Sequence, residues 1–169
     1  MQHVASSPLS RAIFGAKQII SEQQLPDEEN TDPTIFPGFM ELDRGLWCGK
    51  TKAEIGSNIM ARFDACDESV TPEGGESYPT LKNRVLLARD ELLQVTDKGK
   101  ASAIVSHLQV TRCLLSDALG IPVEKMTELK VATASVTCID YDFTTGGKIV
   151  HFQSFKPNFG LEQSKDLAN

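Results

Sequence analysis

The 169-residue chain has the length of one domain, and its 40% hydrophobic and 24% charged residues are typical of a globular protein and not of a disordered one. Its net charge of −6 argues against non-specific binding of nucleic acid, although a few convergent arginines can still hold a small anion. No apolar run approaches the roughly eighteen residues that cross a bilayer, and the first residues do not form a signal peptide.

The first third of the chain predicts one strand, one helix and a long loop. His3–Ser6 fits the end of a short strand. Pro8–Gln23 has apolar residues at helical spacing, with Ser7 as its N-cap and Pro8 at the first helical position. Leu25–Pro37 holds three prolines and predicts an exposed loop, and Phe39–Leu42 predicts a short extended piece.

Two helices are expected in the middle of the chain. Thr51–Cys66 fits a helix that begins with a capping box, because Glu54 stands three residues after Thr51. Asp67–Gly75 predicts a loop. The helix that follows carries one apolar stripe on an otherwise polar surface. The stripe consists of Leu81, Val85, Ala88, Leu92 and Val95.

The last part of the chain alternates short apolar runs with one helical pattern. Ala101–Ser106 is suited to a buried parallel strand, and Val110–Leu119 to a helix that ends at a glycine. Pro122–Leu129 predicts a further short helix. The β-rich runs Ala134–Tyr141 and Lys148–Phe155 predict a hairpin, since a Thr-Thr-Gly-Gly turn joins them.

These patterns together predict an α/β domain with a mixed sheet. We expect it to cover residues 1–156, with a polar tail over residues 157–169.

The cysteines predict structural and not metal-binding roles. Cys48, Cys66, Cys113 and Cys138 form no C-x-x-C pair and match no zinc spacing. Cys113 and Cys138 lie in apolar stretches and fit small core residues. Reduced cysteines suit a reducing compartment, so we expect a cytoplasmic protein without a metal.

Four short motifs are spread over most of the chain. They are Ser6–Ala12 (SSPLSRA), Glu41–Gly49 (ELDRGLWCG), Gly74–Ser77 (GGES) and the pair Ser106-His107. In this order and spacing they resemble the S-S-x-L-x-R-A, E-x-x-x-G-x-W-E-G, G-G-E-S and S-H-G motifs of the histidine phosphatase superfamily, in its phosphoglycerate mutase-like branch. The resemblance implies a three-layer α/β/α fold with a mixed, mostly parallel sheet.

The position of Arg11 suits phosphate binding. It lies just inside a predicted helix that follows a strand, where a guanidinium can grip two phosphate oxygens while backbone N–H groups and Ser7 assist. The alternative is an arginine on a solvated helix face. In the S-H-G motif, the glycine of the family is replaced by Leu108 in this chain. This replacement is tolerable if only the backbone N–H of residue 108 binds phosphate.

The resemblance assigns catalytic roles to His107 and Glu76. His107 ends an apolar strand, at the carboxyl edge where α/β sheets place their sites, and the family's histidine there holds the transferred phosphoryl group. A glutamate in the G-G-E-S loop would give the leaving group its proton, which needs surroundings that favour the neutral carboxyl. The alternative for His107 is a core histidine whose ring is hydrogen-bonded within the protein. The alternative for Glu76 is a carboxylate that only complements the first turn of a helix.

The sequence departs from the family in two ways. The R-H-G motif, which carries the nucleophilic histidine on the first central strand of the sheet, is not found, and neither His3 nor His151 has its context. We therefore expect this strand to be missing, with an unpaired sheet edge in its place. The glutamate of the W-E-G segment is Cys48, which leaves the substrate type open.

The resemblance predicts a metal-independent phosphomonoester hydrolase or mutase relative that works through phosphohistidine, uses no cofactor, and is inactive as a truncated chain. Its partner would be a small phosphorylated metabolite, with no nucleic acid and no membrane. A non-catalytic phosphate-binding pseudophosphatase module is the alternative. A nucleotide-binding α/β domain is disfavoured because no glycine-rich phosphate loop is present. The substrate and the oligomeric state stay open.

Overall fold

The computed structural model describes residues 1–23, 32–142 and 144–157. Its helices and strands follow one another in the order β1 (His3–Ser6), α1 (Ser10–Glu22), β2 (Thr34–Ile35), α2 (Lys52–Ile55), α3 (Ser57–Asp64), α4 (Tyr78–Val95), β3 (Ser102–Val105), α5 (Leu108–Ala118), β4 (Val136–Tyr141) and β5 (Lys148–Phe155). Within these ranges, the 3-10 turns η1 to η4 lie at Pro37–Phe39, Gly45–Trp47, Glu68–Val70 and Val123–Glu128.

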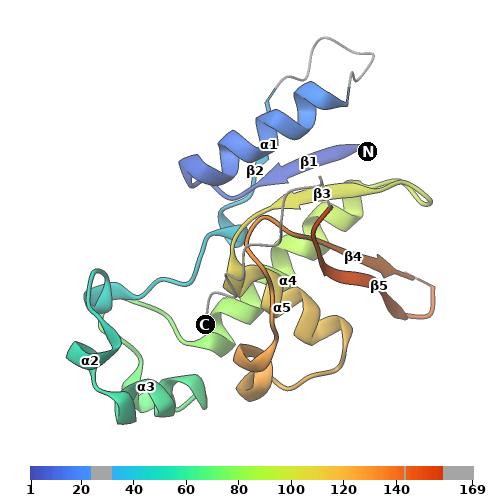
Figure 1. The fold of residues 1–169 in the computed structure, drawn as a ribbon. Coiled ribbons are helices and arrows are strands. Elements are labelled where there is room, and N and C mark those ends of the chain that lie inside the picture. The colour runs from blue at the N-terminus through green and yellow to red at the C-terminus, as the bar shows by residue number, and fades with distance from the viewer. Residues whose placement is uncertain (24–31, 143, 158–169) are drawn as a thin grey trace.

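The strands form a parallel sheet and a separate antiparallel hairpin (Figure 1). The parallel sheet has the order β2-β1-β3, and Ala5 of β1 lies opposite Ile104 of β3. Helix α1 packs on one face, where Gly15 approaches the side chain of Val105. Ala5 belongs to the core cluster that α4 and α5 build on the other face, and the partly buried Ile104 packs against it. The expected layered α/β architecture is therefore confirmed.

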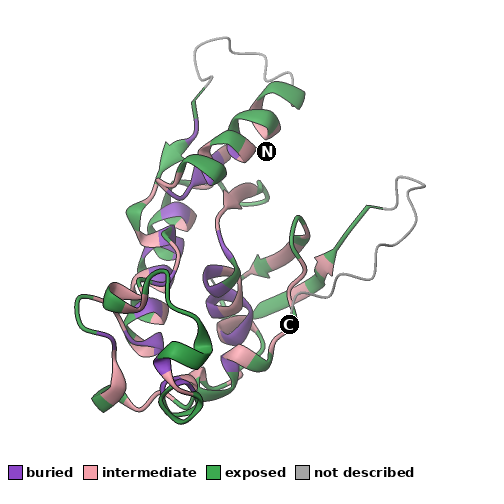
Figure 2. Cartoon of the chain, turned by 60° about the vertical axis from the view of Figure 1, so that its left-hand side comes forward, coloured by how far each residue is buried: buried purple, intermediate pink, exposed green. Residues whose placement is uncertain are grey.

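The core lies mainly between α4 and α5, where buried residues concentrate (Figure 2). Leu81, Val85, Ala88 and Leu92 are all buried, as the apolar stripe predicts. Val95 is 55% exposed, so its place in the stripe was wrong. It is the last residue of α4, where the helix runs past the core that its earlier turns cover.

One edge of β3 is unpaired within the described ranges. Gln2 N–H donates to Ala101 O (2.7 Å) and Ser7 N–H to Val105 O (3.0 Å), so these groups face β1. On the opposite side of β3, no strand of the described residues pairs with it, and β4 pairs only with β5. This is the unpaired edge that the sequence predicts.

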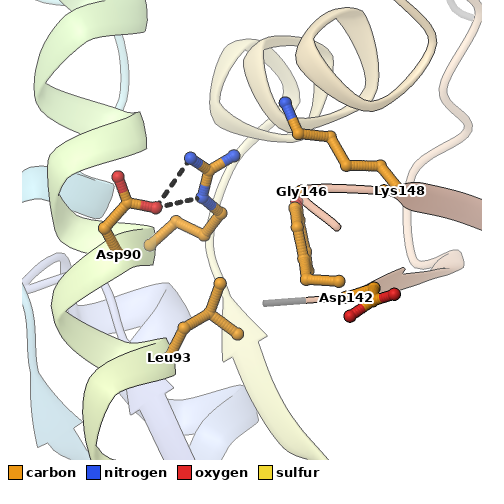
Figure 3. A pocket seen from close by; sticks show the side chains of 8 residues that line it. Asp90, Leu93, Asp142, Gly146 and Lys148 are labelled. Carbon is orange, nitrogen blue, oxygen red and sulfur yellow. Dashed lines mark hydrogen bonds and ion pairs between the residues drawn. The ribbon is translucent and has the colours of Figure 1, made fainter. Parts of the chain in front are cut away.

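The hairpin is held to the helices by side chains. Lys148 Nζ lies 2.8 Å from the carboxylate of Asp117 at the end of α5, and the guanidinium of Arg89 on α4 lies 5.0 Å from the ring centre of Tyr141. A cavity of about 230 Å³ opens between α4 and the hairpin (Figure 3). None of its lining residues is a predicted site residue.

The chain around β1 differs from the expected pattern in two places. Helix α1 begins at Ser10, with Leu9 as its N-cap, and not at Pro8 with Ser7 as the cap. Ser7 Oγ is instead shared between Leu9 N–H and a buried histidine, which fixes the turn before the helix. Thr34 and Ile35, expected in a loop, add a short strand to β1.

The region between β2 and α4 is more broken than its pattern predicts. Residues 37–39 form a 3-10 turn, which overlaps the end of the expected loop at residue 37 and the start of the expected extended piece at residue 39. The helix expected over Thr51–Cys66 is divided into α2 and α3 by Gly56, whose φ of +101° lies outside helical backbone. The capping box of Thr51 and Glu54 is confirmed. α2 and α3 lie away from the sheet (Figure 1). The predicted polar tail, apart from residue 157, falls outside the described residues.

Candidate active site

The carboxyl ends of β1 and β3 bring Ser7 and His107 together. The two strands are parallel neighbours, with Ser6 opposite Val105, so the residues that follow them leave the sheet side by side. The Nε2 atom of His107 lies 2.7 Å from the Oγ atom of Ser7, and both side chains are buried. The two motifs, a hundred residues apart in the chain, therefore form one polar site at this edge.

The surroundings of His107 keep its imidazole neutral. Burial lowers its pKa from the ordinary 6.5 to about 4, and the positive charges of Arg11 and Arg84 act in the same direction. In a neutral imidazole, Nε2 either accepts the hydroxyl hydrogen of Ser7 or donates its own hydrogen to Ser7 Oγ, depending on the tautomer. An anion that compensates the two arginines would favour the cationic form of the ring.

Arg11 contributes a cation to the same edge. It is the second residue of α1 and is exposed. No carboxylate of the described residues forms an ion pair with it, and its charge lies near enough to His107 to influence that ring. Arg11 is thus free to take an anion that approaches the ends of β1 and β3.

The amino end of α5 completes this side of the site. The helix begins at Leu108, directly after His107, and no side chain caps it at His107. The N–H of Gln109 donates to Glu41 Oε1 at 3.3 Å, and the same oxygen accepts from Leu42 N–H at 2.9 Å. The first turn of α5 therefore already holds one carboxylate, as the positive end of a helix favours.

Glu76 is held in an ion pair beside this site. Arg84 Nε lies 2.9 Å from Glu76 Oε2, and Arg84 Nη2 lies 2.5 Å from Glu76 Oε1. The N–H of Asp43 also donates to Glu76 Oε1, at 2.9 Å. Gly75 permits this approach, because a Cβ atom there would lie 2.7 Å from Asp43 O. The Gly74–Ser77 loop and the segment around Asp43 are thus packed backbone against backbone.

The predicted site residues are only partly in direct contact. The structure joins Ser7 to His107, places Leu108 next in the chain, and brings the charge of Arg11 close. Glu76 reaches this group through Arg84, whose charge also lowers the pKa of His107.

Sequence reasoning missed Glu41 and Arg84. Glu41 opens the E-x-x-x-G motif, which was a signal for a functional carboxylate. Arg84 lies on the polar side of α4, where nothing in the sequence distinguishes it from other surface arginines.

Within the described ranges, no group of three or more His, Cys, Asp or Glu residues could hold a metal ion. No helix in that part of the chain is long and apolar enough to span a bilayer.

Comparisons with known proteins agree with this geometry. The chain is 31% identical over 140 residues to the bifunctional protein Rv2228c of Mycobacterium tuberculosis, which covers 82% of this chain and 36% of that protein. It is 29% identical over 143 residues to the "Probable phosphoglycerate mutase GpmB" of Proteus mirabilis, covering 82% and 63% respectively. The chain thus spans about a third of the length of the mycobacterial relative.

Solved structures show the same fold. The mycobacterial glucosyl-3-phosphoglycerate phosphatase Rv2419c, in complex with inorganic phosphate, superposes with a TM-score of 0.72 at 23% identity, over 90% of this chain and 76% of that one. The family model of the histidine phosphatase superfamily (branch 1) matches residues 1–153. With this match, and with two of the family's motifs meeting at the ends of β1 and β3, the chain belongs to the histidine phosphatase superfamily.

Proposed function

We propose that the site at the ends of β1 and β3 binds the phosphoryl group of a small phosphomonoester. The observation that carries the proposal is the buried pair of Ser7 and His107 with the charge of Arg11 beside it. A phosphate would find a guanidinium, an imidazole that gains a proton as the anion approaches, and the N–H of Leu108 at the start of α5. These groups stabilise the charge that develops on the oxygens during phosphoryl transfer.

The reaction we propose is phosphomonoester hydrolysis or transfer through phosphohistidine. Of the three histidines, His107 is the one at the site. His3 starts β1 at its amino end, where its Nε2 lies 2.9 Å from Val95 O, and His151 is on an exposed position of β5. Neither stands where an in-line nucleophile belongs, so we expect the 169-residue chain alone to turn over slowly.

Two carboxylates are candidates for the group that gives the leaving alcohol its proton. Both oxygens of Glu76 accept hydrogen bonds from Arg84 or Asp43. Glu41 accepts its hydrogen bonds from Leu42 and Gln109 through Oε1 alone, among the described residues, and stands at the helix that His107 precedes. A proton donor needs a carboxyl oxygen that can turn to the substrate, so the contacts favour Glu41 over the expected Glu76.

The relatives narrow the substrate class. One is named as a probable phosphoglycerate mutase, and a similar structure is a glucosyl-3-phosphoglycerate phosphatase. We therefore propose a small phosphorylated metabolite as the partner. All four cysteines are free, which fits the cytoplasmic location that we propose.

The proposal is tested first by phosphate binding. The purified chain should bind inorganic phosphate or vanadate in a calorimetric titration, and Arg11→Met should weaken that affinity roughly tenfold, since charge-assisted hydrogen bonds are lost. Arg62→Met is the matched control, because Arg62 pairs with Asp67 in the α2–α3 region and should leave the affinity unchanged. A wild-type chain that binds neither anion would rule out the proposed site.

Turnover of para-nitrophenyl phosphate separates the enzyme from a non-catalytic binding module. We expect the chain alone to hydrolyse it little above background, because removal of a nucleophile costs several orders of magnitude in rate. Fusing a strand that ends in Arg-His-Gly ahead of Met1 should restore turnover, and binding without restoration would favour the pseudophosphatase alternative. Robust hydrolysis lost on His3→Ala or His151→Ala would show a different nucleophile.

A further inference from the structure

Arg84 uses its whole guanidinium within the structure. Nη1 donates to Gly38 O (2.8 Å) and Met40 O (2.9 Å), and Nη2 donates to Glu41 O (3.1 Å). Nε and Nη2 hold the two carboxylate oxygens of Glu76. These five contacts match the five N–H donors of an arginine. The side chain is 26% exposed and that of Glu76 is 12% exposed, so the pair is largely withdrawn from water.

The three carbonyls belong to one short segment, residues 38–41, that leads directly into Glu41. This segment is pressed against the same turn of α4, because a Cβ atom on Gly38 would lie 2.5 Å from the Cβ atom of Ala88 and 3.0 Å from Arg84 O. Arg84 therefore fixes the backbone that carries Glu41 to the rigid surface of α4, with the G-G-E-S loop bound to the other side of its guanidinium.

Glu41 passes this constraint on to the helix that follows His107. Its Oε1 accepts from Gln109 N–H in the first turn of α5. The path from α4 to the phosphate site thus runs from Arg84 through the carbonyl of Glu41 to its carboxylate, and then to α5.

We infer that Arg84 is a positioning residue that sets where the Glu41 carboxylate stands at the amino end of α5. The inference rests on the proposed function, for which it names the group that aims the favoured proton donor. An arginine is required because a lysine has three donors and no planar fork, and cannot hold three carbonyls and a carboxylate together.

The test compares Arg84→Lys and Arg84→Met with Arg89→Met. Arg89 is the matched control, because it lies on the same helix and is paired with Asp90 and Asp117 at the far end from the site. Three quantities are measured for each purified chain: the free energy of unfolding in urea, the affinity for inorganic phosphate, and the NMR signals of the Gln109 amide and the His107 ring.

Both Arg84 variants should shift the Gln109 amide, because the Glu41 carboxylate leaves it. Arg84→Met should bind phosphate roughly tenfold more weakly, because it removes a positive charge that acts on His107. Arg84→Met should also raise the pKa of His107, whereas Arg84→Lys, which keeps the charge, should raise it much less. Arg89→Met should lower stability and move none of the site signals. If Arg84→Met does not fold, the Gln109 amide of Arg84→Lys decides.

An unshifted Gln109 amide in the Arg84 variants, or equal shifts in Arg89→Met, would overturn the inference and leave a merely structural arginine. Failure of the wild-type chain to bind phosphate would end the proposed function by itself. The Gln109 signal is read without any ligand, so the two failures are distinguishable.

Discussion

The ionisation of His107 connects the site to the stability of the molecule. Its pKa is about 4 in the folded chain and near 6.5 in an exposed one, chiefly because the ring is buried. Between these two pH values, the ring of His107 is protonated in the unfolded chain and neutral in the folded one. The free energy of unfolding should therefore fall as the pH is lowered from about 6.5 toward about 4, and this contribution is fully present above 6.5.

We predict that His107→Gln removes this part of the pH dependence. Urea unfolding of the wild-type chain and the variant at pH 7 and pH 4.5 measures the difference, since carboxylates titrate alike in both proteins. A direct NMR titration of the ring should give a midpoint near the folded value of about 4. The prediction fails if the free energy of unfolding changes equally between pH 7 and pH 4.5 in the two proteins, or if the ring titrates with a midpoint near 6.5.

Individual site residues were predictable where a motif coincides with a strand end. Ser7 and His107 each follow a short strand, and parallel strands deliver such residues to one edge. Glu41 had a signal in its motif, but Arg84 had none, because its importance arises from two loops that pack backbone against backbone at Asp43 and Gly75. No periodicity in the sequence reports that contact.

At the scale of an element, α4 carries the largest share of the core. We predict that Leu81→Ala lowers the free energy of unfolding by about 2–5 kcal/mol, because a fully buried leucine leaves a cavity. Leu87→Ala on the same helix is the control: Leu87 is 57% exposed and should change stability by no more than about 0.5 kcal/mol. Urea denaturation of the three chains measures both, and similar losses would mean that the face of α4 is misassigned.

Helix and strand types were predictable because their periodicity is strong, as in α4 and in β5, whose bounds match the expected Lys148–Phe155. The misplaced boundaries have local causes. Ser7 is drawn from its capping role by His107, Gly56 takes a φ that no helix allows, and β2 exists because β1 offers it an edge. Each cause depends on a neighbour distant in sequence or on one backbone angle.

At the scale of the whole molecule, the unpaired edge of β3 makes a measurable prediction. Ala101 and Val105 turn their carbonyls to β1, so by the alternation of a strand Ser102 and Ile104 turn theirs, with their amides, to the open side. The amides of Ser102 and Ile104 should therefore exchange with deuterium faster than those of Ala103 and Val105. Protection of all four would show that another strand covers this edge in solution.

The attachment of the hairpin has a consequence for how the molecule responds to its medium. Backbone bonds do not tie β4 and β5 to the parallel sheet within the described ranges. The contacts of Lys148 with Asp117 and of Arg89 with Tyr141 hold them, together with Ile139, which packs on the core. Forces between partly exposed charges weaken as dissolved ions crowd around them, with a Debye length of about 8 Å at physiological ionic strength. A concentrated salt solution should therefore weaken the attachment of the hairpin more than it weakens the packing of the apolar core.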